Sequence, residues 1–241
     1  MKRSKIEWTE TTWNPSTGCT KISSGCLHCY AENMARRLKA MGMVKYTNGF
    51  QLTCHSDELL MPYSWKKSRI IFVNSMSDLF HEDMPLDFIK KVFGVMNDCR
   101  HHIFQVLTKR ADIMAHYSSL LEFSPNIWMG VTVEHQNYIK RIDYLRNIPA
   151  VVKFLSLEPL LSDLPDLNLL GIDWVIAGGE SGASSRPLEK EWIRNIRDLC
   201  INENVPFFFK QWGGYNKKAA GKTIDDRIWC QMPMINENVF A

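Results

Sequence analysis

The chain has 241 residues, of which 45% are hydrophobic and 23% charged, and its formal net charge is +3. This length suffices for one large α/β domain and excludes the small scaffolds that need disulfides or metals to fold. No apolar stretch is long enough to cross a membrane, and the basic N-terminus lacks a signal peptide's apolar segment. We therefore expect a cytoplasmic protein with no membrane partner. The charge permits a nucleic-acid partner without indicating one.

Short apolar runs alternate with amphipathic stretches along the chain. The predicted strands are 50–54, 69–74, 102–108, 126–132, 151–158, 173–179 and 205–212, and the predicted helices are 30–41, 86–99, 110–122, 135–146 and 188–203. Apolar strands that alternate with helices are typical of a parallel sheet covered by helices. We predict an α/β fold, a partial or closed (β/α) TIM-like barrel with mostly parallel strands. A doubly wound sheet is the alternative, although no G-x-G-x-x-G follows the first strand.

We expect a single barrel domain over residues 1–214 that includes a three-cysteine loop near its N-terminus. Residues 215–241 form a C-terminal extension, which we expect to pack on the barrel or to cover it. A closing hairpin, a substrate lid and a flexible tail all fit its short, partly basic sequence.

Polar or charged residues follow nearly every predicted strand. The carboxyl ends of the strands in parallel (β/α) proteins meet on one face, where ligands bind. Helix capping would explain a serine or an aspartate there, but it explains lysines and glutamates poorly, because such groups are rarely buried without a partner. We expect a shared site, in which a buried Lys210 meets Glu180, Glu158 or a substrate.

Three of the seven cysteines, Cys19, Cys26 and Cys29, have the spacing C-x6-C-x2-C. In a reducing compartment, clustered thiols indicate a metal or redox site rather than disulfides. Three thiolates saturate neither a structural zinc nor a four-iron cluster. His28 could be a fourth zinc ligand, but it directly precedes Cys29, and adjacent residues seldom reach the same ion. In a cluster with three cysteines, one iron keeps an open position for a substrate or cofactor, and we favour this interpretation over zinc.

The segments around these cysteines resemble a known family. They read "WNPSTGCTKISSGCLHCYAEN", "FVNSMSDLFHEDMP", "FLSLEPLL", "VIAGGESG" and "PFFFKQWGG". They are similar to those of an uncharacterised phage and bacterial family with a three-cysteine motif, over about residues 6 to 214. That family in turn resembles the radical SAM enzymes, with spore photoproduct lyase as one relative.

The resemblance implies that the three cysteines hold a [4Fe–4S] cluster whose open iron binds S-adenosylmethionine. An electron donor such as a flavodoxin or ferredoxin would reduce the cluster, and cleavage of S-adenosylmethionine would give a 5′-deoxyadenosyl radical. The implied substrate is a nucleobase or nucleotide in phage or host DNA. The chain departs from the usual C-x3-C-x2-C spacing, and its Gly-Gly-Glu sequence comes later than the usual motif after the second strand.

Candidate site residues follow from this resemblance and from their positions at strand ends. The candidate cofactor-binding residues are Ser75, Ser77, Asp78, Lys109 and Glu158. The first three occupy the place of the motif that binds the methionine amine, and Lys109 could pair with the cofactor's carboxylate. Glu180 and Lys210 are the candidate catalytic residues. Two other functions remain open, a zinc-stabilised nucleic-acid-binding protein and an iron–sulfur redox or sensor protein without S-adenosylmethionine chemistry.

Overall fold

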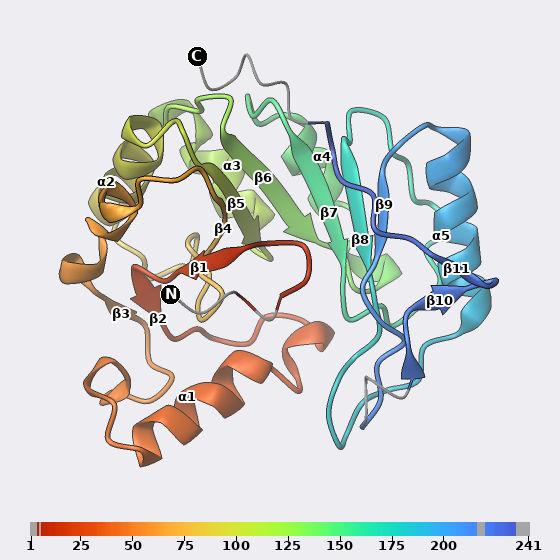
Figure 1. Ribbon diagram of the computed structural model, residues 1–241, viewed down its shortest axis with the longest axis horizontal. Helices are drawn as coiled ribbons and strands as arrows, with labels where there is room; N and C mark the ends of the chain where they lie inside the picture. The colour runs from red at the N-terminus through yellow and green to blue at the C-terminus, as the bar shows by residue number, and fades with distance from the viewer. Residues whose placement is uncertain (1–3, 5, 216–219, 235–241) are drawn as a thin grey trace.

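Seven parallel strands form one sheet that curls into a half-barrel (Figure 1). The computed structural model describes residues 4, 6–215 and 220–234. The strands are β1 (Thr11–Trp13), β4 (Ile70–Val73), β5 (Ile103–Thr108), β6 (Ile127–Thr132), β7 (Lys153–Leu157), β8 (Trp174–Ala177) and β9 (Phe207–Phe209). Each strand pairs in parallel with the next in this order. The predicted α/β partial barrel is confirmed.

One predicted strand lies outside this sheet. Only Thr53–Cys54 of the segment 50–54 is extended, as β3, and it pairs antiparallel with β2 (Ser16–Thr17). The first strand of the sheet is instead β1, which pairs with β4. Its sequence Thr-Thr-Trp is short and largely polar, so no apolar run marks it as a strand. Phe50 packs in a small separate cluster with α1 (Tyr30–Ala40), which explains the apolar character of the segment.

The two faces of the sheet enter different cores. One face packs against the helices α2 (Leu86–Asp98), α3 (Ala111–Tyr117), α4 (Arg141–Arg146) and α5 (Lys190–Asn202). The other face carries large rings: Trp8, Phe72, Trp128, Phe154, Trp174 and Phe208. Gly130 leaves room for one of them, since a Cβ there would lie 2.5 Å from the Phe154 ring. The rings fill the concave face, and the polar candidate site lies beyond them at the carboxyl ends of the strands.

The helices match the predicted segments, with two of them shorter than expected. α3 ends at Tyr117 and is followed by a 3-10 turn at Ser118–Leu120. The segment 135–146 divides into a 3-10 turn at Gln136–Tyr138 and the short α4. α1 stands apart from the other helices, below β1 in the view of Figure 1. It rests on a small core of its own, in which Ala31 and Ala35 pack with Tyr46 and Met76.

The described part of the C-terminal extension covers the β9 edge of the sheet. β10 (Thr223–Ile224) and β11 (Arg227–Ile228) form a hairpin, and the next residues run antiparallel to β9 through a bridge between Phe208 and Cys230. The Trp229 carbonyl accepts a hydrogen bond from the Phe209 amide at 2.9 Å. Residues 216–219 and 235–241 of the extension lie outside the described residues. None of the described helices is long and apolar enough to span a membrane.

Candidate functional site

The three-cysteine loop begins where the chain crosses the carboxyl end of β4. Gly18 forms a parallel bridge with Ser77, and the Cys19 amide donates to the Phe50 carbonyl at 3.1 Å. The φ of Gly18 is 87°, and a Cβ there would lie 2.0 Å from the carbonyl oxygen of Gln51. Only glycine fits this position, so a backbone requirement fixes the start of the loop over the site.

Arg110, just after β5, holds the first cysteine. Its Nη1 donates to Cys19 Sγ at 3.5 Å and to Asp78 Oδ2 at 3.3 Å. Its Nε donates to Glu82 Oε2 at 2.5 Å, and its Nη2 donates to Thr20 Oγ1 at 2.7 Å. Burial and the Asp78 carboxylate raise the pKa of the Cys19 thiol to about 11, although Arg110 works against them. A positive charge is thus already in place where a thiolate ligand would need one.

The neighbouring residue, Lys109, places a positive charge near the second cysteine, Cys26. Burial alone would raise the pKa of the Cys26 thiol, but the Lys109 ammonium and a hydrogen bond with Ser23 outweigh it and lower that pKa. The Ser23 hydroxyl lies 3.5 Å from Cys26 Sγ. Lys109 Nζ otherwise donates to the Thr132 hydroxyl at 3.4 Å. Two adjacent cations at the end of β5 therefore face two of the three thiols.

Glu134, two residues beyond β6, accepts hydrogen bonds from the cysteine loop. Its side chain is fully buried, and one carboxylate oxygen accepts hydrogen bonds from the Ser23 hydroxyl and from the Gly25 amide. The other oxygen accepts from Arg141 Nη1 at 2.8 Å. A Cβ on Gly25 would lie 2.9 Å from Glu134 Cγ, so the loop can approach this carboxylate only with glycine there.

His28 and Glu180 join the third cysteine's side of the loop to the end of β8. His28 Nδ1 lies 3.1 Å from Glu180 Oε2, and Arg186 Nη2 donates to Glu180 Oε1 at 2.6 Å. Burial would raise the pKa of Glu180, but hydrogen bonds from Arg186 and His28 lower it to about 2. Arg186 also donates to the Ser24 carbonyl at 2.9 Å. Glu180, predicted as catalytic, is a buried anchor between the loop and the barrel.

The chemistry of the donors fits an iron–sulfur cluster. Cys19, Cys26 and Cys29 are all half-buried free thiols. Within residues 4, 6–215 and 220–234, no three His, Cys, Asp or Glu side chains are placed to hold a single metal ion together. A four-iron cluster makes no such demand, because each thiolate binds a different iron. His28, the residue considered as a fourth zinc ligand, is engaged with Glu180.

Ser75 and Ser77 form hydrogen bonds with residues of the neighbouring loops. The Ser75 hydroxyl donates to Asn14 Oδ1 at 3.1 Å, and its carbonyl accepts from the Tyr30 hydroxyl. The Ser77 hydroxyl lies 2.8 Å from that of Ser16. Both residues lie at the carboxyl end of β4, as expected, but their hydroxyls already have protein partners.

Asp78 is buried and its carboxylate is surrounded by protein donors. Oδ1 accepts from the Thr108 hydroxyl at 2.7 Å and from the Phe80 amide at 3.0 Å. Oδ2 accepts from the Lys109 amide at 3.1 Å, beside its ion pair with Arg110. This carboxylate can therefore reach a ligand only by giving up one of these bonds.

Lys210 and Glu158 form an ion pair across the barrel mouth. Lys210 Nζ donates to Glu158 Oε1 at 2.6 Å, and each side chain is 18% exposed. The lysine thus meets one of the carboxylates expected for it. Tyr30 lies nearby. Its side chain is largely exposed, but its hydroxyl donates to the Ser75 carbonyl, and desolvation there together with Cys29 and Glu158 raises the pKa of the phenol. Glu158 is accordingly the predicted carboxylate that remains partly open to a ligand.

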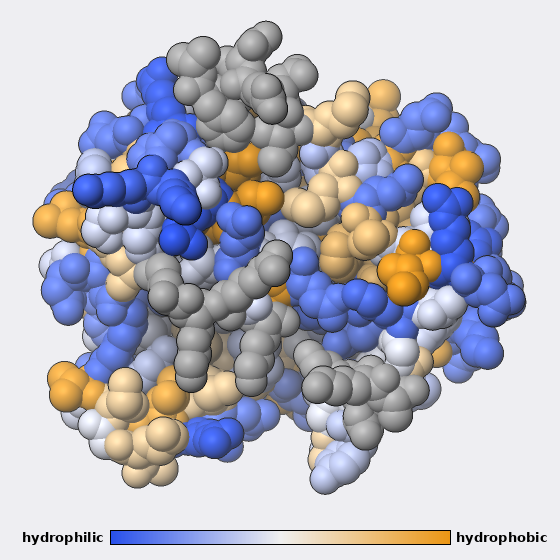
Figure 2. Space-filling view, viewed as in Figure 1, coloured by the Kyte–Doolittle hydropathy of each residue, from blue (hydrophilic) through white to orange (hydrophobic). Residues whose placement is uncertain are grey.

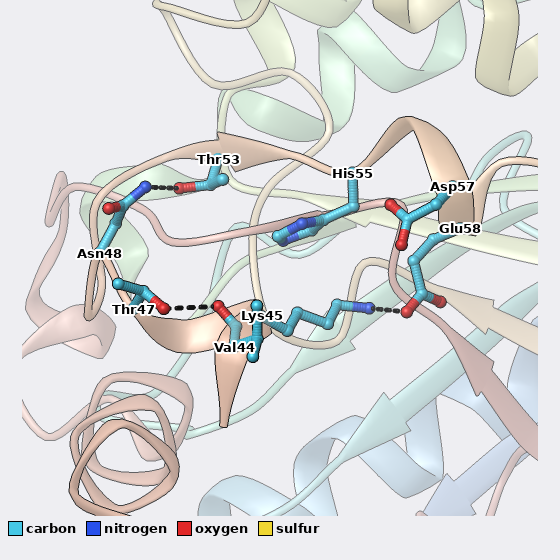
Figure 3. Close-up of a pocket in the computed structure, with 8 residues that line it drawn as sticks. All are labelled: Val44, Lys45, Thr47, Asn48, Thr53, His55, Asp57 and Glu58. Atoms are coloured by element: carbon cyan, nitrogen blue, oxygen red, sulfur yellow. Dashed lines mark hydrogen bonds and ion pairs between the residues drawn. The ribbon is translucent and has the colours of Figure 1, made fainter. Parts of the chain in front are cut away.

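The pockets formed by the described residues include two that are lined by parts of the segment 21–58. One of about 330 Å³ opens beside Cys29 and is lined by Lys21, Leu27, His28, Glu32, Asn33, Arg36 and the loop 181–184. The larger one, of about 420 Å³, lies between Val44 and Glu58 and contains none of the three cysteines. There Lys45 reaches across to Glu58 at 2.9 Å, with His55 beside them (Figure 3). The smaller pocket is the one that belongs to the candidate site.

Three residues of the site were not predicted as functional from the sequence. Glu134 could have been found by the argument used for Glu158, because it comes two residues after an apolar strand and Glu158 comes directly after one. Arg141 and Arg186 gave no comparable signal. They stand six or more residues beyond a strand and reach the site only through the fold.

Comparisons with known proteins place these features in context. A family model described as "Protein of unknown function (DUF5131)" matches residues 3–233. A search of curated proteins found no match. Two solved structures of spore photoproduct lyase resemble the fold. One is a mutant with bound AdoMet and dinucleoside spore photoproduct (TM-score 0.50, 11% identity), and the other is a complex with the dinucleoside (TM-score 0.51, 12% identity).

Each comparison with the lyase covers 82% of this chain and 63% or 62% of the lyase. The chain therefore spans about three-fifths of the lyase. At this level of identity the likeness concerns the fold: both chains form the same kind of partial barrel.

Proposed function

We propose that this chain, which belongs to the DUF5131 family, is a radical SAM enzyme in which Cys19, Cys26 and Cys29 hold a [4Fe–4S] cluster. When bound, the cluster would supply the electron that cleaves S-adenosylmethionine to a 5′-deoxyadenosyl radical. The observation that carries the proposal is the set of three half-buried free thiols, two of them facing fixed cations, at the carboxyl end of a parallel half-barrel. The likeness to the lyase fold supports it.

The cations beside the thiols are the first part of the proposal. Arg110 donates to Cys19 Sγ, and Lys109 lowers the pKa of Cys26. Thiolates rather than thiols bind metal, and a nearby cation favours the thiolate. We propose that Lys109 favours the charged form of Cys26, and that Arg110 offsets part of the effect of burial and of Asp78 on Cys19, so that this thiol loses its proton when it binds iron.

Lys109 and Glu158 would receive the cofactor. Lys109 Nζ donates to the Thr132 hydroxyl at 3.4 Å, and no carboxylate among the described residues lies within ion-pair distance of it. It can therefore pair with the carboxylate of S-adenosylmethionine. Glu158 is partly open beside Lys210 and can accept a hydrogen bond from the cofactor's amine or ribose. Ser75, Ser77 and Asp78 would act by holding the loops around this position.

Glu180 and Lys210 would then act as positioning residues. Glu180 fixes His28 beside Cys29, and Lys210 fixes Glu158 at the mouth. Glu180 would thus act through His28, and Lys210 through Glu158. The implied partners are a one-electron donor such as a flavodoxin or ferredoxin and a substrate with an abstractable hydrogen, for which nucleic acid is the class we favour.

Anaerobic purification followed by iron and sulfide analysis tests the proposal. About four irons per chain, bleaching of the optical spectrum by dithionite, and 5′-deoxyadenosine from added S-adenosylmethionine are expected. Replacing Cys19, Cys26 or Cys29 by alanine should abolish iron binding. Cys230→Ala is the matched control, because this thiol is exposed and remote in sequence from the loop. A colourless protein with about one zinc per chain, as in a closed structural site, would overturn the proposal.

A further inference from the structure

Residues 19–45, which carry the cysteine loop and α1, concentrate the positive charge of the chain. This segment contains five lysine or arginine residues and one glutamate, whereas the whole chain has a net charge of +3. All other residues together therefore carry a slight negative charge. Three of the basic residues, Arg36, Arg37 and Lys39, are exposed on α1. Such a patch beside a candidate active site attracts a polyanion.

The same segment exposes large apolar side chains. Leu27 is 57% exposed, Tyr30 58% and Met34 41%, and Met41, Met43 and Val44 are exposed as well. Figure 2 shows hydrophobic and hydrophilic residues side by side over α1, at the lower left of the view. Tyr30 and Met34 are one turn apart and share a face of the helix. We call the exposed side chains of Leu27, Tyr30, Met34, Arg36, Arg37 and Lys39 the α1 face.

A concave feature lies at the end of the α1 face nearest the cysteines. The pocket of about 330 Å³ beside Cys29 has Lys21 and Arg36 on its lining, together with Ser181 and Ser184. Glu32 pairs with both cations, with Lys21 Nζ at 2.9 Å and with Arg36 Nη2, so a phosphate would compete with this carboxylate for them. Ammonium, guanidinium and hydroxyl donors around a hollow of this size suit a phosphate group with its sugar.

We propose that the α1 face binds single-stranded nucleic acid, with bases against Tyr30 and Met34 and phosphates on Arg36, Arg37 and Lys39. Proteins hold single strands by combining side chains on which bases stack with cations that follow the phosphates. The Tyr30 hydroxyl donates to the Ser75 carbonyl, so the face begins at the barrel mouth. A strand lying on α1 therefore leads to the cysteine loop. As an assignment of the substrate, this inference rests on the proposed function.

An acidic protein would also complement the positive charge of the α1 face. The polar pocket argues for the nucleic acid, because a hollow of about 330 Å³ takes one group of an extended chain more readily than the convex surface of a folded partner. An exposed aromatic ring and a methionine followed by three cations on the same helix likewise provide a surface for bases beside partners for phosphates.

Fluorescence anisotropy with a labelled single-stranded DNA of twelve mixed nucleotides tests the inference, using the anaerobically purified full chain at 50 to 300 mM salt. The triple variant Arg36→Gln, Arg37→Gln, Lys39→Gln should weaken binding roughly 10- to 100-fold at 0.1 M salt. It should also reduce the slope of log K against log salt by about 2, since each lost phosphate contact removes about 0.7. Met34→Ala should weaken binding severalfold and leave the slope unchanged, because it removes a surface for a base rather than a charge.

The matched control removes the same charge elsewhere, through Lys66→Gln, Lys90→Gln and Lys91→Gln, three exposed lysines outside the segment. It should bind as the unaltered chain does. Three results would overturn the inference: no binding by the unaltered chain, equal losses in both triple variants, or displacement of the DNA by polyglutamate at equal charge. The last result would point to an acidic protein instead.

Iron content and 5′-deoxyadenosine formation are measured on the same preparations. A chain that carries the cluster but fails the DNA test refutes this inference alone. A chain without iron that still binds DNA through the α1 face supports the surface and refutes the proposed chemistry. The two failures are therefore distinguishable.

Discussion

Arg110 places its Nη1 atom 3.5 Å from the sulfur of Cys19. The same guanidinium is paired with Asp78 and Glu82, and its side chain is only 4% exposed. A buried cation with two carboxylate partners has little freedom to move. The position of the first thiol is thus tied to the end of β5, and the loop around it is ordered by the protein's own charges.

Replacing Arg110 by glutamine should destabilise the fold strongly. It would leave the buried carboxylate of Asp78 without its cation, and removal of one partner of a buried pair costs about 3–5 kcal/mol. Urea unfolding of the chain under reducing conditions measures the loss. Arg100→Gln removes a pair in which both side chains are mostly exposed and should change little. An Arg110→Gln chain as stable as the unaltered one would show that the pair is not needed for folding.

Gly25→Ala should disturb the cysteine loop, because its Cβ would lie 2.9 Å from the side chain of Glu134. We expect lower iron content after anaerobic reconstitution and a lower unfolding midpoint. Gly94→Ala is the matched control: this glycine is in α2 with open space around it, and the change should stabilise by about 0.5–1 kcal/mol. If both variants took up iron equally, the close approach of Gly25 to Glu134 would have no part in shaping the loop.

The stability should fall as the pH decreases from 6.5 towards 4 because of His102. Burial lowers the pKa of this imidazole from 6.5 to about 4. Between these values the unfolded chain binds a proton that the folded chain does not, so acidification favours unfolding. The change is about 2–3 kcal/mol over this range. Denaturant titrations from pH 4.5 to 7.5 measure it.

His102→Asn is the variant that isolates this group. It should reduce the pH dependence above pH 4.5, whatever it does to the absolute stability. Below that value Glu82 and Glu180, whose pKa values are lowered to about 2, add their own loss of stability as they protonate. An unchanged slope between pH 6.5 and 4.5 in the variant would assign the effect to other groups.

Lys210→Met should affect the cofactor site more than the thiols. It removes the partner of Glu158, whose Oε1 lies 2.6 Å from Lys210 Nζ, and among the described residues the Lys210 side chain has no hydrogen bond or ion pair with the cysteine loop. We expect normal iron content with S-adenosylmethionine cleavage reduced at least tenfold. Lys222→Met, which removes an exposed pair with Glu7, serves as the control. Loss of iron from the Lys210 variant would show that this lysine supports the cluster site as well.

The strands of the half-barrel could be predicted because they are buried on both faces and read as apolar runs. Six of the seven predicted runs entered the sheet, and the run 50–54 did not, because its Phe50 packs against α1 instead. β1 was missed because three residues at the edge of a sheet need little hydrophobicity. The helix pattern was reliable for α2 and α5, which have wide apolar faces.

The site was harder to predict than the fold. Residues that directly follow strands, such as Lys109 and Glu158, were found by position alone. The partners of Glu180 were not found in this way. His28 is 152 residues away in the sequence, and Arg186 is only six residues away but has no strand-end position that marks it. Asp78 is an example. A carboxylate just after a strand suggests a contact with a ligand, yet four donors of the protein already bind this one. Whether a polar group is free depends on tertiary contacts.

The edge strands β1 and β9 do not pair with each other. In a closed barrel, the number of strands, their tilt and their stagger are linked, so a change in one connection affects the whole ring. An open arc has no such closure condition. A connection can lengthen, or the arc can widen, without breaking a hydrogen bond between any two strands. The gap between β1 and β9 can therefore change in width while the carboxyl ends of the seven strands keep their order.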